Sequence, residues 1–399
     1  MTASLDPLAG QQPSVDQPVR RIPGDPLQDA PSPGIALCLS GGGYRAMLFH
    51  LGALWRLNEL GYLHKLDRVS SVSGGSITAG VLAMNWSNLA FDAGGVSQAF
   101  REQVVCPVRK MGRTTIDVPA ILLGILVDIL SFGRRGSLTP MFYERSLFHG
   151  TTLQNLPDPL PRFVFNSTSL QSGVLWRFSK PYMADYRVGL IMKPDTRLAV
   201  AVGASSAFPP FISPVVLKPK ESDFEPGSGK DLQRKPYTTR VVLTDGGVYD
   251  NLGLETAWKK YDTILISDAC ARGGPEESPA FNWLWQPYHV LMLINSQVTA
   301  LRKRQAINSF VTNQRKGVYW GIGTDIANYK LGYTLPCPVQ QTAALASFET
   351  RLRKTPARTQ EALINWGYAV CDAGMRAYVD KTLPPPVDFP YPGVGVSLS

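Results

Sequence analysis

The segment VSSVSGGSITAG, residues 69–80, joins two kinds of local structure. The apolar run from Val69 to Val72 is typical of a short buried strand, and the small residues after Ser73 continue with the character of a helix. A serine at such a corner has two interpretations. It either caps the helix N-terminus, or it is a nucleophile held on a strained turn beside glycines. The rest of the sequence has to decide between them.

The chain upstream shows the same order of elements. Ile35–Leu39 is an apolar run that predicts a buried strand, and Ser40 and three glycines follow it. Apolar residues at helical spacing from Ala46 to Leu60 predict a helix that stops at Gly61. Strand, helix, strand and helix in this order indicate an α/β fold with a mostly parallel central sheet. Further strands are predicted at 163–167, 175–178, 241–243, 263–266 and 290–294, and further helices at 255–261, 343–353 and 358–379.

Composition divides the chain into three parts. Residues 1–33 are rich in Pro, Gln, Asp and Ser and lack apolar periodicity, which predicts a disordered N-terminal arm. Residues 34–275 carry the α/β pattern. Residues 276–399 are expected to form a C-terminal extension that completes the sheet and adds helices and an extended tail.

The charge of the chain favours anionic partners. Forty Lys and Arg residues against 31 Asp and Glu residues give a formal net charge of +9. Basic and aromatic residues are not interleaved in the way that a nucleic-acid groove requires. We therefore expect no nucleic acid as a partner and favour an anionic membrane surface.

One apolar segment is a candidate for contact with such a surface. Residues 118–132 form an apolar run that Asp128 interrupts, and the run is too short to span a bilayer. Basic residues flank it on both sides within 109–135. Two interpretations stay open: a membrane-docking lid, and an ordinary buried helix with solvated ends.

The five cysteines predict a reducing compartment. They are scattered and show no CxxC spacing, so neither a disulfide framework nor a zinc site is expected. The N-terminal stretch MTASLDPLAG lacks the basic and apolar regions of a secretory signal. We expect a cytoplasmic protein that is soluble or at most peripheral at the inner face of the membrane.

Three segments that suit a catalytic site directly follow predicted strands. They are Gly41, Gly42 and Gly43 with nearby Arg45; Ser73 with Gly74 and Gly75; and Asp245 with Gly246 and Gly247. Parallel strands place their carboxyl ends at one edge of a sheet, so we expect the three segments to meet there. Glycine N–H groups beside a helix N-terminus bind an anion, and an activated serine attacks an acyl carbonyl, so the set predicts a serine hydrolase. Arg45 either neutralises a phosphate or covers a helix terminus.

A serine nucleophile needs a base that accepts its proton. His50 lies within the first predicted helix, and His64 lies before the strand that leads to Ser73. His149 has no comparable turn around it, and His289 precedes an apolar run instead of following one. Asp245 is therefore the better candidate, acting with Ser73 as a dyad.

These segments resemble the patatin-like phospholipase family. The matching stretches are SGGGYRAMLFHLGAL (40–54), SVSGGS (71–76), AVAVGASSAFPPF (199–211) and LTDGGVYDNLG (243–253), and they come in family order within about residues 35–270. Two positions depart from the family pattern, since Ser71 and Ala46 stand where glycine is usual, but both are small.

The resemblance implies a three-layer α/β sandwich and hydrolysis of the acyl esters of phospholipids or lysophospholipids. It implies Ser73 as nucleophile, Asp245 as base and Gly41, Gly42 and Gly43 as the oxyanion hole, with no catalytic metal and no cofactor.

Three rival interpretations accompany this one. The glycine run also fits the G-x-G-x-x-A pattern of a dinucleotide site, but the second strand lacks the acidic residue that would hold a ribose. An α/β-hydrolase would use Ser73, Asp245 and His289 as a triad. A non-catalytic scaffold would bind lipid at the same cleft.

Overall fold

The computed structural model describes residues 31–116, 137–209, 212–270, 277, 282 and 285–398. Its strands are β1 (Ser32–Leu39), β2 (Arg68–Ser71), β3 (Arg162–Ser169), β4 (Leu175–Phe178), β5 (Tyr182–Asp185), β6 (Gly189–Met192), β7 (Val215–Leu217), β8 (Val241–Asp245), β9 (Tyr261–Asp268) and β10 (Lys316–Gly321). Its α-helices are α1 (Gly43–Glu59), α2 (Gly74–Asn85), α3 (Cys106–Met111), α5 (Thr139–Tyr143), α6 (Leu198–Ser205), α7 (Gly247–Asp250), α8 (Glu255–Trp258), α9 (Trp285–Val311), α10 (Val339–Ala346) and α11 (Ala357–Tyr378).

Short helical turns connect these elements. The 3₁₀ turns are η1 (Leu63–Lys65), η2 (Trp86–Asn88), η5 (Leu153–Asn155), η6 (Glu221–Asp223) and η7 (Ile326–Tyr329). The π-helical turns are η3 (Arg101–Val105) and η4 (Glu144–Phe148).

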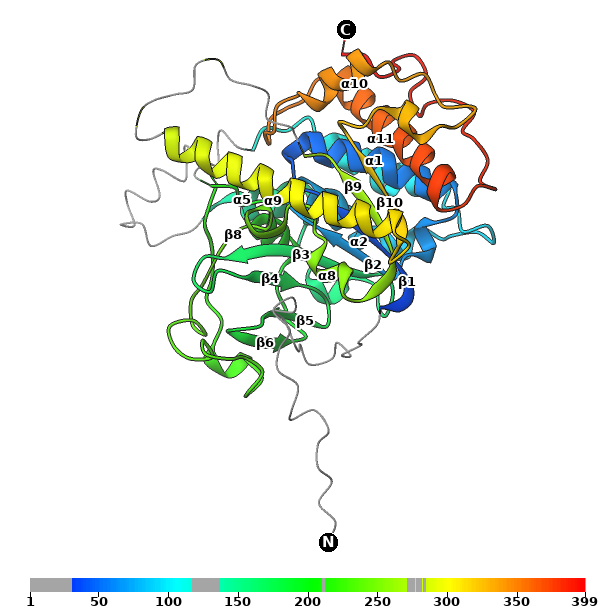
Figure 1. Ribbon diagram of the computed structural model, residues 1–399. Coiled ribbons are helices and arrows are strands. Elements are labelled where there is room, and N and C mark those ends of the chain that lie inside the picture. The colour runs from blue at the N-terminus through cyan, green and yellow to red at the C-terminus, as the bar shows by residue number, and fades with distance from the viewer. Residues whose placement is uncertain are drawn as a thin grey trace.

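The described part of the chain builds one large sheet between layers of helices (Figure 1). Its strand order is β10-β9-β1-β2-β3-β4-β5-β6, and β8 pairs with both β3 and β7. The run β10-β9-β1-β2-β3 is parallel, as predicted, while β4 to β8 add antiparallel pairings. The protein is thus a three-layer α/β sandwich with a mostly parallel central sheet.

Alternate residues of β1 enter the two layers, because successive side chains of a strand point to opposite faces. Leu37 and Leu39 join the larger apolar core, together with residues of α1, α2, α6 and α11. Ala36 and Cys38 join a smaller core, together with Ala257 on α8 and Ala306 on α9. We call the helical layer over the larger core the thick layer and the helical layer over the smaller core the thin layer.

Helices α1 and α11 pack closely against each other in the thick layer (Figure 1). A Cβ atom at Gly52 would lie 1.9 Å from the carbonyl oxygen of Ile364, and one at Gly367 would lie 1.9 Å from that of Phe49. Two glycines therefore let the helix backbones approach each other at the centre of the contact.

Several predicted boundaries differ from the structure. Residues 290–294, predicted as a strand, lie within α9, because a short apolar run does not distinguish a strand from a helix segment. The helix predicted at 343–353 is α10, which ends at Ala346. Strand β1 starts at Ser32, two residues before Gly34, while residues 1–30 of the predicted arm lie outside the described residues.

The predicted lid segment falls largely on residues 117–136, which are outside the described residues. On its N-terminal flank, Arg109 forms an ion pair with Glu361 and lies 4.6 Å from the centre of the Tyr391 ring. Within the described residues, no helix is long and apolar enough to cross a membrane.

Candidate active site

Ser73 sits on a sharp corner between β2 and α2. Its backbone has φ 51° and ψ −120°, a left-handed conformation that is strained for a residue with a side chain. A Cβ atom at Gly74 would lie 2.0 Å from the carbonyl oxygen of Gly43, so the corner packs directly against the glycine-rich loop. The Ser73 side chain makes no capping hydrogen bond to α2. The structure therefore favours the strained-turn interpretation over the helix cap.

Hydrogen bonds from neighbouring elements hold this corner. The Ser73 N–H donates to Ser205 Oγ on α6 at 3.0 Å, and Ser205 Oγ also lies 2.8 Å from Ser76 Oγ. On the sheet side, Asn166 Nδ2 donates to the carbonyl oxygen of Ser71 at 2.9 Å. The backbone of the nucleophile candidate is thus fixed from two directions.

Strand β3 sets the distance between Ser73 and Asp245. Ser71 of β2 pairs with Phe165, and Asp245 of β8 pairs with Ser167, two residues further along β3. Two residues of a strand span roughly 7 Å. Strand β8 thus continues beyond the end of β2 along the same edge of β3. The carboxyl end of β8 therefore comes next to the corner that carries Ser73.

The Asp245 carboxyl group is buried, with 1% of the residue exposed. Its Oδ1 accepts a hydrogen bond from the Gly247 N–H at 2.7 Å. Its Oδ2 is buried and accepts no hydrogen bond from any residue that the structure describes. One oxygen anchors the carboxylate, and the other is left to accept a proton.

Burial raises the pKa of Asp245 to about 7. The Gly247 N–H and the hydroxyl group of Ser73 both act to lower this pKa, since each stabilises the carboxylate. The Ser73 hydroxyl therefore lies within interaction range of the carboxyl group. A base with a pKa near neutrality is well matched to proton transfer at neutral pH.

The glycine-rich loop presents N–H groups beside this pair. Gly42 has φ 140° and Gly43 has φ 60°, conformations that favour glycine. Within the described chain, the N–H groups of Gly42, Gly43 and Gly74 have no hydrogen-bond partner. Gly42 immediately precedes α1, Gly43 is its first residue, and Gly74 is the first residue of α2, so these groups suit an anion.

Gly41 differs from the other two glycines predicted for the oxyanion hole. Its N–H donates to the carbonyl oxygen of Asn251 at 3.0 Å, so the group is already used. Among the predicted donors, Gly42 and Gly43 keep an N–H group without a partner in the described chain, and so does Gly74, which was predicted only as a supporting residue.

Arg45 anchors the loop from behind. It is 1% exposed, and its guanidinium donates to the carbonyl oxygen of Ala269 at 3.1 and 3.3 Å and to that of Phe348. These contacts support the structural interpretation of Arg45 over the phosphate-binding one. They also connect the loop to the C-terminal region of the chain, as does the bond from the Tyr44 N–H to the Arg351 carbonyl oxygen.

Asn251 is a site residue that the sequence analysis missed. Its carbonyl oxygen accepts the hydrogen bond from the Gly41 N–H. Its Oδ1 would lie 2.3 Å from a Cβ atom added at Gly41 and 2.6 Å from one added at Gly247. Its side chain therefore fills the space between the glycine loop and the aspartate turn. Asn251 lies within the quoted LTDGGVYDNLG stretch, as Ser205 lies within AVAVGASSAFPPF, so the signal was present.

The histidines do not join the site in the described structure. His50 is buried and bonds Ser40 and Ser267, and burial lowers its pKa to about 4. His289 is exposed on α9, whereas Asp245 is buried. Asp245 Oδ1 accepts its hydrogen bond from the Gly247 N–H and not from a histidine. His64 and His149 lie in η1 and at the end of η4.

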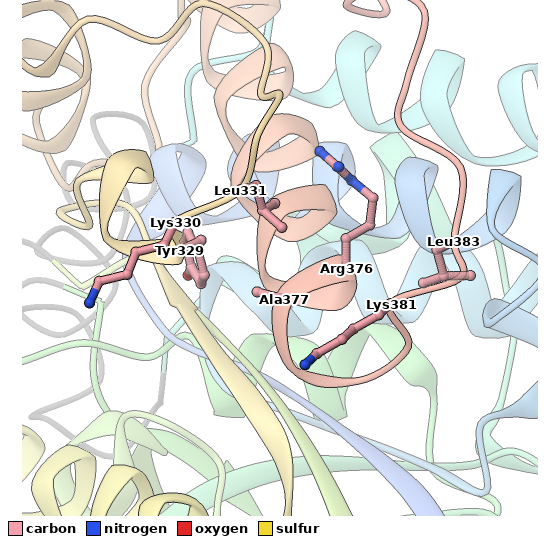
Figure 2. A pocket seen from close by; sticks show the side chains of 7 residues that line it. All are labelled: Tyr329, Lys330, Leu331, Arg376, Ala377, Lys381 and Leu383. Carbon is pink, nitrogen blue, oxygen red and sulfur yellow. The ribbon is translucent and has the colours of Figure 1, made fainter.

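Two further features lie elsewhere. A cavity of about 330 Å³ is lined by Tyr329, Lys330, Leu331, Arg376, Ala377, Lys381 and Leu383, none of which belongs to the Ser73 site (Figure 2). The Arg376 side chain in its wall is bonded to Asp372. Among the described residues, no group of three or more His, Cys, Asp or Glu side chains could hold a metal ion.

Comparison with known proteins identifies a family. The sequence profile described as "Patatin-like phospholipase" matches residues 37–258, which include all three segments of the site. No curated protein sequence matches the chain.

Three solved structures illustrate the matches to proteins of known structure. Human GIVD cytosolic phospholipase A2 is 14% identical with a TM-score of 0.45, and the match covers 84% of this chain and 60% of that one. The same human protein in complex with methyl gamma-linolenyl fluorophosphonate is 15% identical with a TM-score of 0.44, covering 87% and 58%. VipD from Legionella pneumophila is 16% identical with a TM-score of 0.29, covering 85% and 66%. The chain thus spans about three fifths of the length of the human protein.

Proposed function

The chain belongs to the patatin-like phospholipase family, and from this premise we propose that it is a serine acyl hydrolase that cleaves fatty-acyl esters of phospholipids or lysophospholipids with a Ser73–Asp245 dyad. One observation carries the proposal. A buried carboxylate lies beside a serine on a strained corner, with the N–H groups of Gly42, Gly43 and Gly74 next to them. Among the described residues, one carboxylate oxygen and the three N–H groups have no hydrogen-bond partner.

The first half of the reaction acylates the serine. Asp245 Oδ2 takes the hydroxyl proton as Ser73 Oγ attacks the ester carbonyl, and the glycine N–H groups stabilise the oxyanion that forms. Each such donor is worth roughly 3 kcal/mol in the transition state. As the tetrahedral intermediate collapses, the alcohol leaves with the proton from Asp245, and an acyl-Ser73 ester remains.

The second half releases the acyl chain. Asp245 takes a proton from water, and the hydroxide attacks the acyl carbonyl while the same N–H groups stabilise the charge. Collapse returns the proton to Ser73 Oγ and frees the fatty acid. Asp245 suits both steps because its pKa of about 7 leaves it largely ionised just above neutrality yet still basic.

A cytoplasmic location and a phospholipid surface as the source of substrate belong to the same proposal. All five cysteines are free thiols, which supports a reducing compartment. The excess of basic residues supports an anionic membrane as the surface that supplies lipid.

The test combines fluorophosphonate labelling with hydrolysis of phospholipid vesicles and of a short soluble ester. We expect wild type to be labelled and to hydrolyse both substrates, Ser73→Ala to do neither, and Asp245→Asn to lose hydrolysis. His289→Ala is the control and should retain wild-type rates. Loss of activity in His289→Ala would instead indicate the triad, and a wild-type protein that binds vesicles without labelling or hydrolysis would indicate a non-catalytic scaffold.

A further inference from the structure

Helix α9 exposes an apolar stripe along its outer side. Residues three, four and seven positions apart share one face of a helix. Of the exposed large apolar residues of α9, Met292 (38% exposed) and Ile307 (37%) lie off this face. The others form the stripe: Val290 (51%), Leu293 (62%), Ile294 (54%), Leu301 (58%) and Val311 (73%). We call this set the outer stripe.

In the C-terminal half of α9, the opposite side of the helix faces the protein. Ala306 is fully buried in the thin layer, and Ser309 is 5% exposed. Arg302 lies 3.7 Å from Asp250 and 3.3 Å from Glu255, and its guanidinium lies 5.8 Å from the centre of the Tyr249 ring. Figure 1 shows α9, in yellow, crossing in front of the sheet, with its N-terminal half extending beyond the strands. The outer side of α9 therefore exposes more large apolar side chains than the polar face of a surface helix normally does.

The charge of α9 points to an anionic partner. Its 27 residues contain no Asp or Glu. Arg302 is committed to carboxylates of the protein, whereas Arg304 is exposed. Arg304 falls on the same side as the outer stripe, because it lies three residues after Leu301. An apolar stripe accompanied by a cation matches the boundary between acyl chains and anionic headgroups.

The position of α9 connects this stripe to the site. Helix α9 contacts α7, which begins two residues after Asp245, and the Arg302–Asp250 pair joins the two helices. A surface that binds the outer stripe is thus held beside the carboxyl edge of the sheet where Ser73 and Asp245 meet.

We propose that the outer stripe of α9 docks on a bilayer containing anionic phospholipids, with Val290, Leu293, Ile294 and Leu301 inserted at the level of the headgroups. This inference rests on the proposed function, since a lipid hydrolase has to draw its substrate from such a surface. A second copy of the chain is the less favoured occupant. Two α9 helices that paired through this stripe would bring positive charge against positive charge with no acidic residue on either helix.

Vesicle binding tests the proposal without relying on catalysis. The variant is the double substitution Leu293→Glu with Ile294→Glu, which adds negative charge to two exposed positions. Leu170→Glu is the matched control, because Leu170 is 54% exposed and lies outside α9, at the turn after β3. The full chain is sedimented with vesicles of phosphatidylcholine with and without phosphatidylglycerol, and each variant is also assayed on a short soluble ester.

Wild type and Leu170→Glu should sediment with the anionic vesicles, and the double variant should bind at least about tenfold more weakly. All three should hydrolyse the soluble ester at the same rate. Equal vesicle binding by wild type and the double variant overturns the proposal, as does failure of wild type to bind. A double variant that changes the oligomeric state but not vesicle binding assigns the stripe to a second copy instead.

The same data separate this proposal from the proposed function. If binding depends on the outer stripe but no substrate is hydrolysed, the docking surface stands and the enzymatic proposal fails. If the soluble ester is hydrolysed but the vesicles are not bound, the enzymatic proposal stands and the docking surface fails.

Discussion

The two faces of the sheet are covered in different ways. In the thick layer, α1 and α11 approach so closely that Gly52 and Gly367 leave no room for a side chain. In the thin layer, α9 is held by a few buried contacts and by the pairing of Arg302 with Asp250 and Glu255. The thick layer is stabilised by close apolar packing, while the thin layer depends on polar contacts and leaves one side of its longest helix exposed.

Both residues of the candidate dyad lie next to the thick layer. Ser73 precedes α2, whose apolar residues belong to the larger core, and Asp245 follows Leu243 of the same core on the same face of β8. The serine is thus positioned by the more tightly packed side. Asp245 Oδ2 has no hydrogen-bond partner among the described residues, and the helix that follows Asp245, α7, contacts α9 of the thin layer.

The largest effect is expected at the close contact between α1 and α11 in the thick layer. Gly52→Ala should lower the free energy of unfolding by about 3 kcal/mol or more, because the new Cβ would lie 1.9 Å from the backbone oxygen of Ile364 and α11 would have to move. The better helix propensity of alanine, about 1 kcal/mol, offsets only part of this loss. Chemical denaturation followed by circular dichroism measures the change.

Gly374→Ala on α11 is the control for this prediction. The nearest atoms to its new Cβ are side-chain atoms, Cγ2 of Val318 at 3.1 Å and Cε3 of Trp320 at 3.5 Å, which can adjust. Its effect should stay within about 1 kcal/mol. Equal destabilisation by the two variants would remove the contrast between close backbone packing and ordinary packing.

Ionised Asp245 is expected to lower the free energy of unfolding in the pH range where it can act as a base. Its pKa is raised from 3.8 to about 7 by burial, so the folded state binds a proton that the unfolded state has lost between these values. The stability associated with this group is therefore fully present below pH 3.8 and is lost as the pH rises towards 7. Asp245→Asn should gain stability relative to wild type by a few kcal/mol between pH 4 and pH 8. A difference that does not depend on pH would contradict the raised pKa.

The rate of hydrolysis should follow the same titration. Below pH 7 the Asp245 carboxyl group is protonated and accepts no proton from Ser73, so kcat/KM should fall about tenfold for each pH unit below that value. A pH series on the soluble ester, run where wild type remains folded, measures this. A half-maximal rate near pH 4 would mean that the titrating base has an unshifted carboxyl pKa.

Local patterns made Ser73 and Asp245 predictable. A strand, a glycine-flanked polar residue and a helix follow one another within about ten residues, so the sequence alone carries the signal for each corner. The family and the α/β class are confirmed by the profile match and by the sheet. The dyad itself remains a prediction that the burial of Asp245 and the conformation of Ser73 support.

Contacts between distant segments were not predictable in this way. Gly41 was assigned to the oxyanion hole from the family resemblance, and nothing in its sequence neighbourhood reveals that its N–H bonds Asn251. The pairing of β8 with β3, which brings Asp245 next to Ser73, is likewise a tertiary contact. Residues 290–294 were predicted as a strand because the apolar run fits the interior of a sheet, whereas the structure exposes most of it on α9.

A smaller effect is expected from the ion pair that holds the thin layer. Arg302→Met should lower the free energy of unfolding by about 2 kcal/mol, because Asp250 is 1% exposed and would lose the cation beside its carboxylate. Lys303→Met on the same helix is the control. Lys303 Nζ lies 4.0 Å from Asp268 Oδ2, which also accepts a hydrogen bond from the Tyr319 hydroxyl, so the loss is expected to stay below about 1 kcal/mol. If Arg302→Met is as mild as the control, apolar contacts rather than charge hold α9.

The smallest effect is expected at the hydrogen bond behind the nucleophile. Ser205→Ala removes the acceptor of the Ser73 N–H and should lower the free energy of unfolding by about 1 kcal/mol. Because the bond fixes the corner rather than touching substrate, kcat should fall several-fold while KM and the pH profile stay unchanged.

Ser206→Ala is the control, since the Ser206 hydroxyl bonds Val202 and Tyr143 and does not contact the corner. If both variants lose the same stability but only Ser205→Ala loses rate, the tight packing of the thick layer serves to position Ser73. If neither loses rate, the backbone of the corner is rigid enough without Ser205, and the contrast between the layers concerns stability alone.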